Sequence, residues 1–409
     1  MPSIAANSFP APSLNVWRAT VAGACASLIG IGLARFAYTP LLPAIIEAHW
    51  FSASAATYLG AANLGGYLAG ALAAGAMARR VPAIVVLRAM MLLATASFVA
   101  CAVPLSFLWF FAWRFAAGVS GGALMVLAAP TILPHIPPSR RGFVSGGVFA
   151  GIGLGVAASG TLVPLLLQRG LVSTWLGLAC VSLLLTLVAW QGWPGPAHAA
   201  AEPQPAPQQA TPAQAQPTAG LRALYAEYGL NAVGLVPHMI FLVDFVARGL
   251  GQGVDAGARY WVLYGLGAVA GPLASGHLAD RIGFGRALRM AYGLQIIAVA
   301  IPVVSVGSAG LAISSVLVGA FTPGVVPLVL GRVNELLAHQ GDAARHAWSR
   351  ATTSFAVFQA LAAYGLSYLF TTRGGDYRML FAVGASALAL ALTVDLLAAR
   401  RRFINGATP

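Results

Sequence analysis

Long apolar stretches narrowly limit the folds open to this chain. Only 8% of its 409 residues are charged and 59% are hydrophobic, whereas about a quarter of a typical soluble chain is charged. The stretches reach roughly 20 residues, the length at which an α-helix crosses a bilayer, and they lack the alternation of barrel strands. The sequence therefore predicts an all-α integral membrane protein.

The apolar stretches form two sets of six around a proline-rich segment. Residues 193–220 contain seven prolines among Ala and Gln, a composition typical of an extended linker. The predicted spans are 17–45, 55–78, 84–104, 106–130, 142–166 and 171–192, then 222–250, 259–279, 287–307, 309–333, 350–371 and 378–399. The predicted division is a disordered tail at 1–16, a six-helix bundle at 17–192, the linker at 193–220, a second six-helix bundle at 221–400 and a tail at 401–409.

The basic residues predict an orientation. All 23 are Arg, and the formal net charge is +13, which in a soluble domain would suggest nucleic acid. If both termini and the linker are cytoplasmic, 16 of the Arg residues face the cytoplasm and five face the other side. This agrees with the positive-inside rule. The charge therefore indicates topology, and we expect no nucleic-acid partner.

A charged, glycine-rich turn separates two spans of the second set. Gly276, Asp280, Arg281, Gly283 and Arg286 form the pattern G-x-x-x-D-R-x-G-x-x-R. A degenerate copy lies 201 positions earlier, where Gly75 stands in place of Gly276, and Gly66 and Gly70 precede it as Gly267 and Gly271 precede the second copy. The pattern resembles the signature between adjacent helices of major facilitator superfamily transporters. The two halves of the chain therefore resemble each other as internal repeats.

The resemblance implies a function. Superfamily members have two six-helix halves that rock about a site near the membrane midplane. A small-molecule substrate, protons as the coupling ion, a monomeric state and no cofactor are what it implies for this chain. The run from Gly30 to Pro43 resembles a bacterial branch of predicted permeases. We therefore expect a multi-pass protein of the bacterial inner membrane, with the substrate left open.

By the same resemblance, the turn would act in gating. Asp280, with Arg281 and Arg286, would form a cytoplasmic latch against the start of the eleventh span. In the first copy, Arg79 stands at the position of Asp280, followed by Arg80, so any gate of this kind is asymmetric. The alternative is that these Arg residues act only as topology determinants.

Two Arg residues interrupt apolar spans. Arg35 lies in the first span and Arg114 in the fourth, and a charge at a helix centre costs roughly 2.5–3.5 kcal/mol on insertion scales. Each is expected to face a cavity or a partner. Arg114 precedes Gly118 and Gly122, and this arrangement resembles the superfamily's fourth-helix motif, which is implicated in proton coupling. The alternatives are an ion pair for Arg35 and Arg-to-backbone contacts for Arg114.

The seventh span holds the only acidic residue that the sequence places deep inside a predicted span. Asp244 is the proton-carrier candidate, because a substrate that competes for a nearby Arg could couple binding to protonation. Arg248 is four residues further on and shares its helical face, so a pair within the helix is the alternative. His238 lies on another face and is a weaker candidate. The sequence leaves open whether Arg35, Arg114 and Asp244 face one cavity.

Further polar and helix-breaking residues complete the predicted pathway. Pro323, Gly324 and Pro327 predict a kink or local unwinding in the tenth span, either lining a pathway or static. The remaining side chains that could orient a ligand, or only join helices, are Tyr38, Asn63, Gln359 and Tyr364.

Several functions are disfavoured. A chain without Lys has no P-loop, so ATP-driven transport within it is excluded. The seven His residues form no ligand-spaced pair, which argues against a metal site or a metalloenzyme. Two membrane-embedded Arg residues against one Asp favour an organic anion as substrate. Proton-linked export of drugs or metabolites is the alternative, and a membrane-embedded enzyme or sensor is a remote one.

Overall fold

The computed structural model describes residues 15–137, 140–194, 218–337 and 341–404, and these ranges contain helices and no strand. Eleven helices in them are long and apolar enough to cross a membrane. Helix α3 (Ala53–Arg80), with 28 residues, is as long as these spans. The predicted all-α membrane fold with two six-helix bundles is confirmed.

The first half consists of six spans. Its first span is divided into α1 (Val16–Ser27), the π-helix η1 (Leu28–Leu33) and α2 (Tyr38–Glu47). The others are α3, α4 (Ala83–Cys101), α5 (Phe107–Ile132), α6 (Arg141–Leu167) and α7 (Leu171–Ala189), with the short η2 (Leu133–His135) after α5. We call this the N half.

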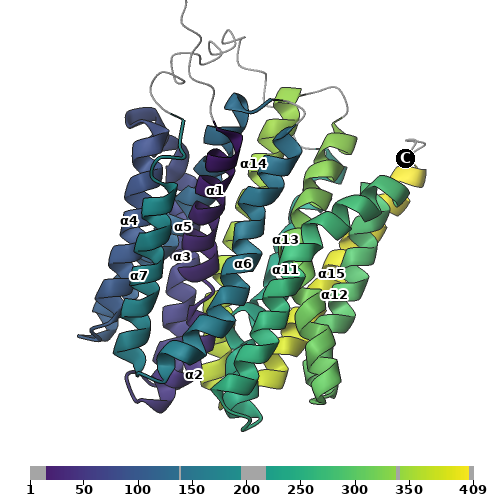
Figure 1. Ribbon diagram of the computed structural model, residues 1–409. Coiled ribbons are helices and arrows are strands. Elements are labelled where there is room, and N and C mark those ends of the chain that lie inside the picture. The colour runs from purple at the N-terminus through teal and green to yellow at the C-terminus, as the bar shows by residue number, and fades with distance from the viewer. Residues whose placement is uncertain (1–14, 138–139, 195–217, 338–340, 405–409) are drawn as a thin grey trace, which may run out of the picture.

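The second half, the C half, repeats the plan. Its first span is divided into α9 (Ala219–Val236), the π-helix η4 (Pro237–Phe241), α10 (Leu242–Asp244) and the π-helix η5 (Phe245–Gly249). The others are α11 (Val254–Ile282), α12 (Phe284–Val304), α13 (Ser308–Leu336), α14 (Gly341–Thr372) and α15 (Tyr377–Ile404). We call the end of the molecule where α7 ends and α9 begins the linker end, which is at the top of Figure 1, and the opposite end the far end.

Glycines set the helix packing in both halves. A Cβ on Gly70 of α3 would lie 2.1 Å from the carbonyl oxygen of Val119 on α5. At the equivalent position of the C half, a Cβ on Gly271 of α11 would lie 1.8 Å from the carbonyl oxygen of Ala320 on α13. Such distances leave room for hydrogen only, so the backbones of the two helices touch. The repeated glycines therefore allow the same close helix packing in both halves.

The two halves meet mainly at the middle and the far end. Helix α6 packs along α11 (Figure 1), and a Cβ on Gly265 would lie 2.3 Å from the amide nitrogen of Ala157. Helix α3 packs along α14, and the hydroxyl oxygens of Thr371 and Ser54 are 2.9 Å apart. The halves therefore touch directly at the far end.

The equivalent first and seventh spans both depart from α-helical geometry. In the first span, η1 is followed by a turn at 34–37 before α2 resumes. In the seventh span, two π-helices flank the three residues of α10. π-Helical turns leave backbone carbonyls in unusual positions and are frequent at functional sites. The two broken spans face each other, since α2 packs against α10 and η4.

In the tenth span, α13 is α-helical without interruption from Ser308 to Leu336, with Pro323 and Pro327 inside it. The span is therefore not unwound, and a kink at Pro323, Gly324 and Pro327 stays a prediction. Gly324 allows close packing on α11, because a Cβ there would lie 2.7 Å from the Ser275 hydroxyl.

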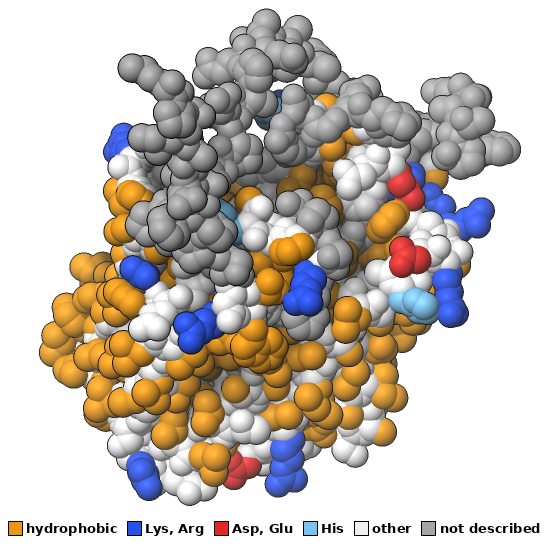
Figure 2. Space-filling view, turned by 45° about the horizontal axis from the view of Figure 1, so that its top comes forward, with side chains coloured by type: hydrophobic (Ala, Val, Ile, Leu, Met, Phe, Trp, Pro, Cys, Tyr) orange, Lys and Arg blue, Asp and Glu red, His pale blue; other side chains and the backbone are white. Residues whose placement is uncertain are grey.

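The surface fits a bilayer. A band of hydrophobic side chains covers the visible side of the molecule, and Arg side chains lie above and below it (Figure 2). Many large apolar side chains are exposed, among them Leu273 at 75% and Leu108 at 73%. Exposure on this scale is unfavourable in water but matches contact with lipid. The protein is therefore a multi-pass membrane protein.

Candidate functional site

A small cavity lies where the two broken spans meet. Its volume is about 20 Å³, which is on the order of the space for one water molecule. A larger ligand therefore requires the two halves to part. The N half contributes Arg35, Tyr38, Thr39, Gly60, Asn63, Leu64 and Arg114 to its lining, and η4 contributes Met239 and Ile240.

Arg114 is held beneath the break in the first span. Its side chain is 2% exposed, and Nη1 donates to the carbonyl oxygen of Ala34 at 2.8 Å. Ala34 opens the non-helical turn, and Asn63 Nδ2 donates to the same oxygen at 3.2 Å. The guanidinium carbon lies 4.3 Å from the centre of the Tyr38 ring, a favourable cation–π distance. The Arg-to-backbone contact, which was the alternative for Arg114, is present, and this hydrogen bond uses one of its five side-chain N–H groups.

Arg35 reaches across to the C half. Its Nη2 donates to the thioether sulfur of Met239 at 3.5 Å, and its guanidinium carbon lies 5.3 Å from the centre of the Tyr67 ring. Gln359 of α14 donates to the same sulfur at 3.6 Å. A thioether is a weak acceptor. Two strong donors, one from each half, thus share an acceptor that satisfies neither well.

The cavity carries positive charge without a protein counter-charge. None of the residues that line it is acidic, and among the described residues neither Arg35 nor Arg114 forms an ion pair. The Nε atom of each is buried without a hydrogen-bond partner. Charges buried in proteins are normally paired. The arrangement is therefore suited to an anion with several acceptor oxygens.

Asp244 lies outside this cavity, in a network at the far end. The side chain is fully buried and accepts from Arg248 Nε at 2.5 Å and Nη2 at 2.6 Å. The Tyr377 hydroxyl donates to Asp244 Oδ2 at 2.5 Å and accepts from Arg248 Nη2 at 3.0 Å. The ion pair within the helix, which the spacing allowed, is thus present. We call these three residues the far-end network.

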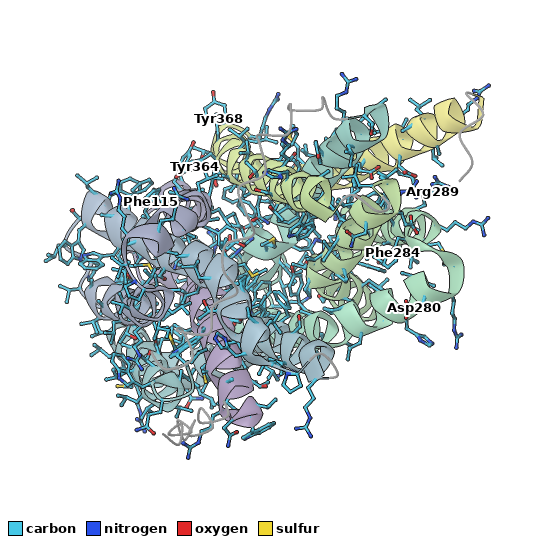
Figure 3. The ribbon with its side chains drawn as sticks, turned by 90° about the horizontal axis from the view of Figure 1, so that it is seen from above. Phe115, Asp280, Phe284, Arg289, Tyr364 and Tyr368 are labelled. Carbon is cyan, nitrogen blue, oxygen red and sulfur yellow. The ribbon has the colours of Figure 1, made fainter. Side chains whose placement is uncertain are left out.

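The other ligand candidates divide between the cavity and the helix interfaces. Tyr38 and Asn63 line the cavity beside both Arg residues, and Gln359 reaches it through Met239. His238 points away from it, because its Nε2 bonds the Ser314 hydroxyl at 2.8 Å within the C half. Tyr364 packs against Tyr58 of α3, at the interface of the halves (Figure 3).

Met239 and Thr39 were not singled out from the sequence. The Thr39 hydroxyl donates to the backbone carbonyl of Met239 at 2.5 Å, so Met239 contacts the N half through both backbone and side chain. Apolar periodicity marks a Met as a core residue. The nearest sequence signal is Pro237, two residues earlier, which has no backbone N–H and so interrupts the regular helix hydrogen bonding.

Two further acids are buried. Glu227 of α9 is 2% exposed, and Asp395 of α15 is 4% exposed. Both lie closer to the ends of the predicted spans than Asp244, and the sequence analysis did not single them out. Arg289 of α12 donates to Asp395, and Figure 3 shows Arg289 in the C half. These acids belong to the C half and do not line the cavity.

The glycine-rich turn lies at the linker end of the C half. Gly283 has a φ of +83° and joins α11 to α12, which explains a glycine there. Asp280 is exposed at the rim (Figure 3) and forms no ion pair with any described residue. The acid that faces a helix start here is Glu335, which accepts from the Phe284 amide at 3.1 Å. Arg281 and Arg286 are exposed at the same turn, and Arg79 and Arg80 are exposed at the linker end of α3 in the N half.

Twelve spans in two repeated bundles, with a polar cavity between their broken helices, define a membrane transporter of the two-bundle class. Residues 27–396 match the model of the family described as "Uncharacterised MFS-type transporter YbfB". The chain belongs to this family of the major facilitator superfamily. A comparison with curated proteins found no match.

Solved structures share the fold. A D-xylose–proton symporter matches with a TM-score of 0.71 at 15% identity, over 92% of this chain and 97% of that one. A point mutant of the nucleoside transporter NupG matches with a TM-score of 0.73 at 12% identity, over 93% and 99%. A bacterial homologue of the human lysosomal transporter Spinster, in an inward-facing and occupied conformation, matches with 0.66 at 15%, over 96% and 98%. The family and these neighbours are transporters and not enzymes.

Proposed function

We propose that this protein moves a small organic anion across the bacterial inner membrane by alternating access, with Arg35 and Arg114 as the contacts for a carboxylate. The observation that carries the proposal is the pair of guanidinium groups that line one cavity with no acid beside them. A carboxylate accepts up to four hydrogen bonds and pairs with guanidinium in a bidentate manner. It would supply the counter-charge that the protein does not.

Anion binding would also link the halves. Arg114 and Arg35 belong to the N half, while Gln359 belongs to the C half and shares the Met239 sulfur with Arg35. A carboxylate oxygen is a far stronger acceptor than a thioether. A bound anion that replaces this sulfur would draw donors of both halves together, as closure around a substrate requires.

Proton coupling is the second part of the proposal, with Asp244 as the carrier. The far-end network joins the seventh span to the start of α15 within the C half. Protonation of Asp244 would remove the charge that holds Arg248 and Tyr377. The seventh span, which also packs against α2 of the N half, could then shift, and in this proposal that shift favours opening at the far end.

Topology and assembly complete the proposal. The linker end, which carries most of the Arg residues, would face the cytoplasm, because such residues accumulate on that side. The chain would work as a monomer, since both halves that build the cavity come from one chain. The alternative of exporting a lipophilic cation would need an acid in the cavity, and the lining residues include none.

Uptake into proteoliposomes tests the proposal. The purified protein would be reconstituted with an inward proton gradient and supplied with labelled short-chain carboxylates. We expect accumulation that Arg114→Leu removes and that Arg88→Leu retains. Arg88 is the matched control, since it lies on α4 outside the cavity and donates to the backbone of Trp190. Accumulation of a lipophilic cation instead, or equal carboxylate uptake in Arg114→Leu, would overturn it.

A further inference from the structure

Asn63 leaves one hydrogen-bond acceptor unused at the cavity. The side chain is 1% exposed, and its Nδ2 donates to the carbonyl oxygens of Ala34 and Arg114, both at 3.2 Å. Its Oδ1 is buried without a partner. The orientation of the amide is fixed, because a flipped amide would set Oδ1 against two carbonyl oxygens. A buried acceptor without a donor costs on the order of 1–3 kcal/mol.

An unused amide oxygen alone does not mark a site. Asn231 of α9 also has a buried Oδ1 without a partner, while its Nδ2 donates to Gln295 at 2.8 Å. Asn63 differs because it lines the cavity together with Arg35 and Arg114. Its Nδ2 also bonds the backbone of Arg114, which places the amide next to that residue. The cavity therefore combines many N–H donors for an anion with the Asn63 amide oxygen, a buried acceptor that has no donor of its own.

The hydroxyl protons of the lining are already used. The Tyr38 hydroxyl donates to the carbonyl oxygen of Ala56 at 2.7 Å, and the Thr39 hydroxyl donates to that of Met239 at 2.5 Å. Neither can donate to a ligand in this arrangement, although both oxygens can still accept. Gly60, Leu64 and Ile240 form an apolar wall. Hydroxyl groups of a ligand that lie against this wall would lose water without finding partners.

From these contacts we infer that the substrate is a 2-hydroxy monocarboxylate with an apolar remainder. The carboxylate lies on the guanidinium groups, and the hydroxyl on the neighbouring carbon donates to Asn63 Oδ1. A 2-ammonium group would offer the same donor, but two guanidinium groups without an acid repel it. The inference rests on the anion site proposed above and adds which anion the site selects.

Four acids of equal carbon number test the inference on the wild-type protein. They are 2-hydroxybutanoate, butanoate, 2-aminobutanoate and 2,3,4-trihydroxybutanoate, each used as a competitor and as a stabilising ligand in a thermal melt. We expect 2-hydroxybutanoate to bind about tenfold more tightly than butanoate, which corresponds to about 1.4 kcal/mol. The amino acid and the trihydroxy acid are expected to bind no better than butanoate.

A variant pair assigns the preference to Asn63. In Asn63→Leu the preference for the 2-hydroxy acid over butanoate should fall to about one, while Asn231→Leu keeps it. Equal binding of hydroxy acid and butanoate by the wild type overturns the inference and leaves the anion site standing. Binding of none of the acids overturns the proposed function itself. If Asn63→Leu does not fold, the ligand series on the wild type still decides.

Discussion

The cavity and the far-end network hold Arg residues in opposite situations. Arg114 at the cavity is almost fully buried and has one backbone hydrogen bond. Arg248 is partly exposed and makes two bonds to a carboxylate and one to a hydroxyl. The position of a charged residue inside a membrane protein therefore does not identify a binding site by itself. What separates a candidate binding residue from a structural one is whether the protein supplies its counter-charge.

The largest effect is expected at Arg114. In Arg114→Leu the anion loses its most buried charge-assisted contact, and hydrogen bonds to charged groups are worth about 1.5–3 kcal/mol each. Transport should fall about a hundredfold, measured as initial uptake per folded protein. Size-exclusion chromatography is the check on folding, and Arg88→Leu is the matched control. Uptake at the wild-type rate would remove Arg114 from the site.

At the far-end network, Asp244→Asn should separate coupling from binding. The amide cannot release a proton, so accumulation driven by a proton gradient should disappear, while substrate exchange without a gradient should persist. Uptake and counterflow are measured on the same vesicles. Tyr377→Phe, which removes one hydrogen bond to the same carboxylate, should retain accumulation. Equal loss of accumulation and exchange in Asp244→Asn, or normal accumulation, would count against its role.

A smaller effect is expected at Arg35, which is half-buried and contacts only the Met239 sulfur and neighbouring rings. Arg35→Gln should weaken carboxylate binding about tenfold, consistent with the loss of one charge-assisted bond. Competition against a labelled carboxylate measures this. Met239→Leu, which removes the weak acceptor and keeps the volume, should bind carboxylates at least as well as the wild type. Weaker binding in Met239→Leu would mean that the sulfur is not displaced by the anion.

The smallest effect concerns the glycine-rich turn. A Cβ on Gly276 would meet no atom within 4 Å in this conformation, so Gly276→Ala should fold normally. If the turn closes the linker end in the other conformation, the added methyl group should slow turnover severalfold. Gly271→Ala, whose Cβ would lie 1.8 Å from a backbone oxygen, should instead reduce the folded amount. Wild-type turnover in Gly276→Ala would leave the turn with a topological role only.

The sequence predicted the architecture well because apolar length and glycine spacing act locally. Twelve spans, the two halves and the paired roles of Gly70 and Gly271 follow from such patterns. The site was predicted in part. Arg35, Arg114, Tyr38 and Asn63 were identified by their polarity within apolar spans, and the structure places all four at one cavity.

Other features depended on tertiary contacts that no local pattern encodes. Asp244 was predicted as a proton carrier, with a pair to Arg248 as the alternative, but the contribution of Tyr377, 133 positions away, could not be predicted. Met239 has no polar signature, and its role follows from the meeting of two broken helices. Pro323 and Pro327 predicted a kink or local unwinding, and α13 continues through both prolines without unwinding.

One measurement tests the central claim most directly: a thermal melt of the detergent-purified protein against organic acids, sugars, amino acids and cationic drugs. A ligand that binds only the folded state raises the melting temperature, by an amount equivalent to about 2.7 kcal/mol at a hundred times its dissociation constant. Our account predicts stabilisation by monocarboxylates that Arg114→Leu or Arg35→Gln reduces and Arg88→Leu retains. Stabilisation only by lipophilic cations, lost in Asp244→Asn, would contradict it.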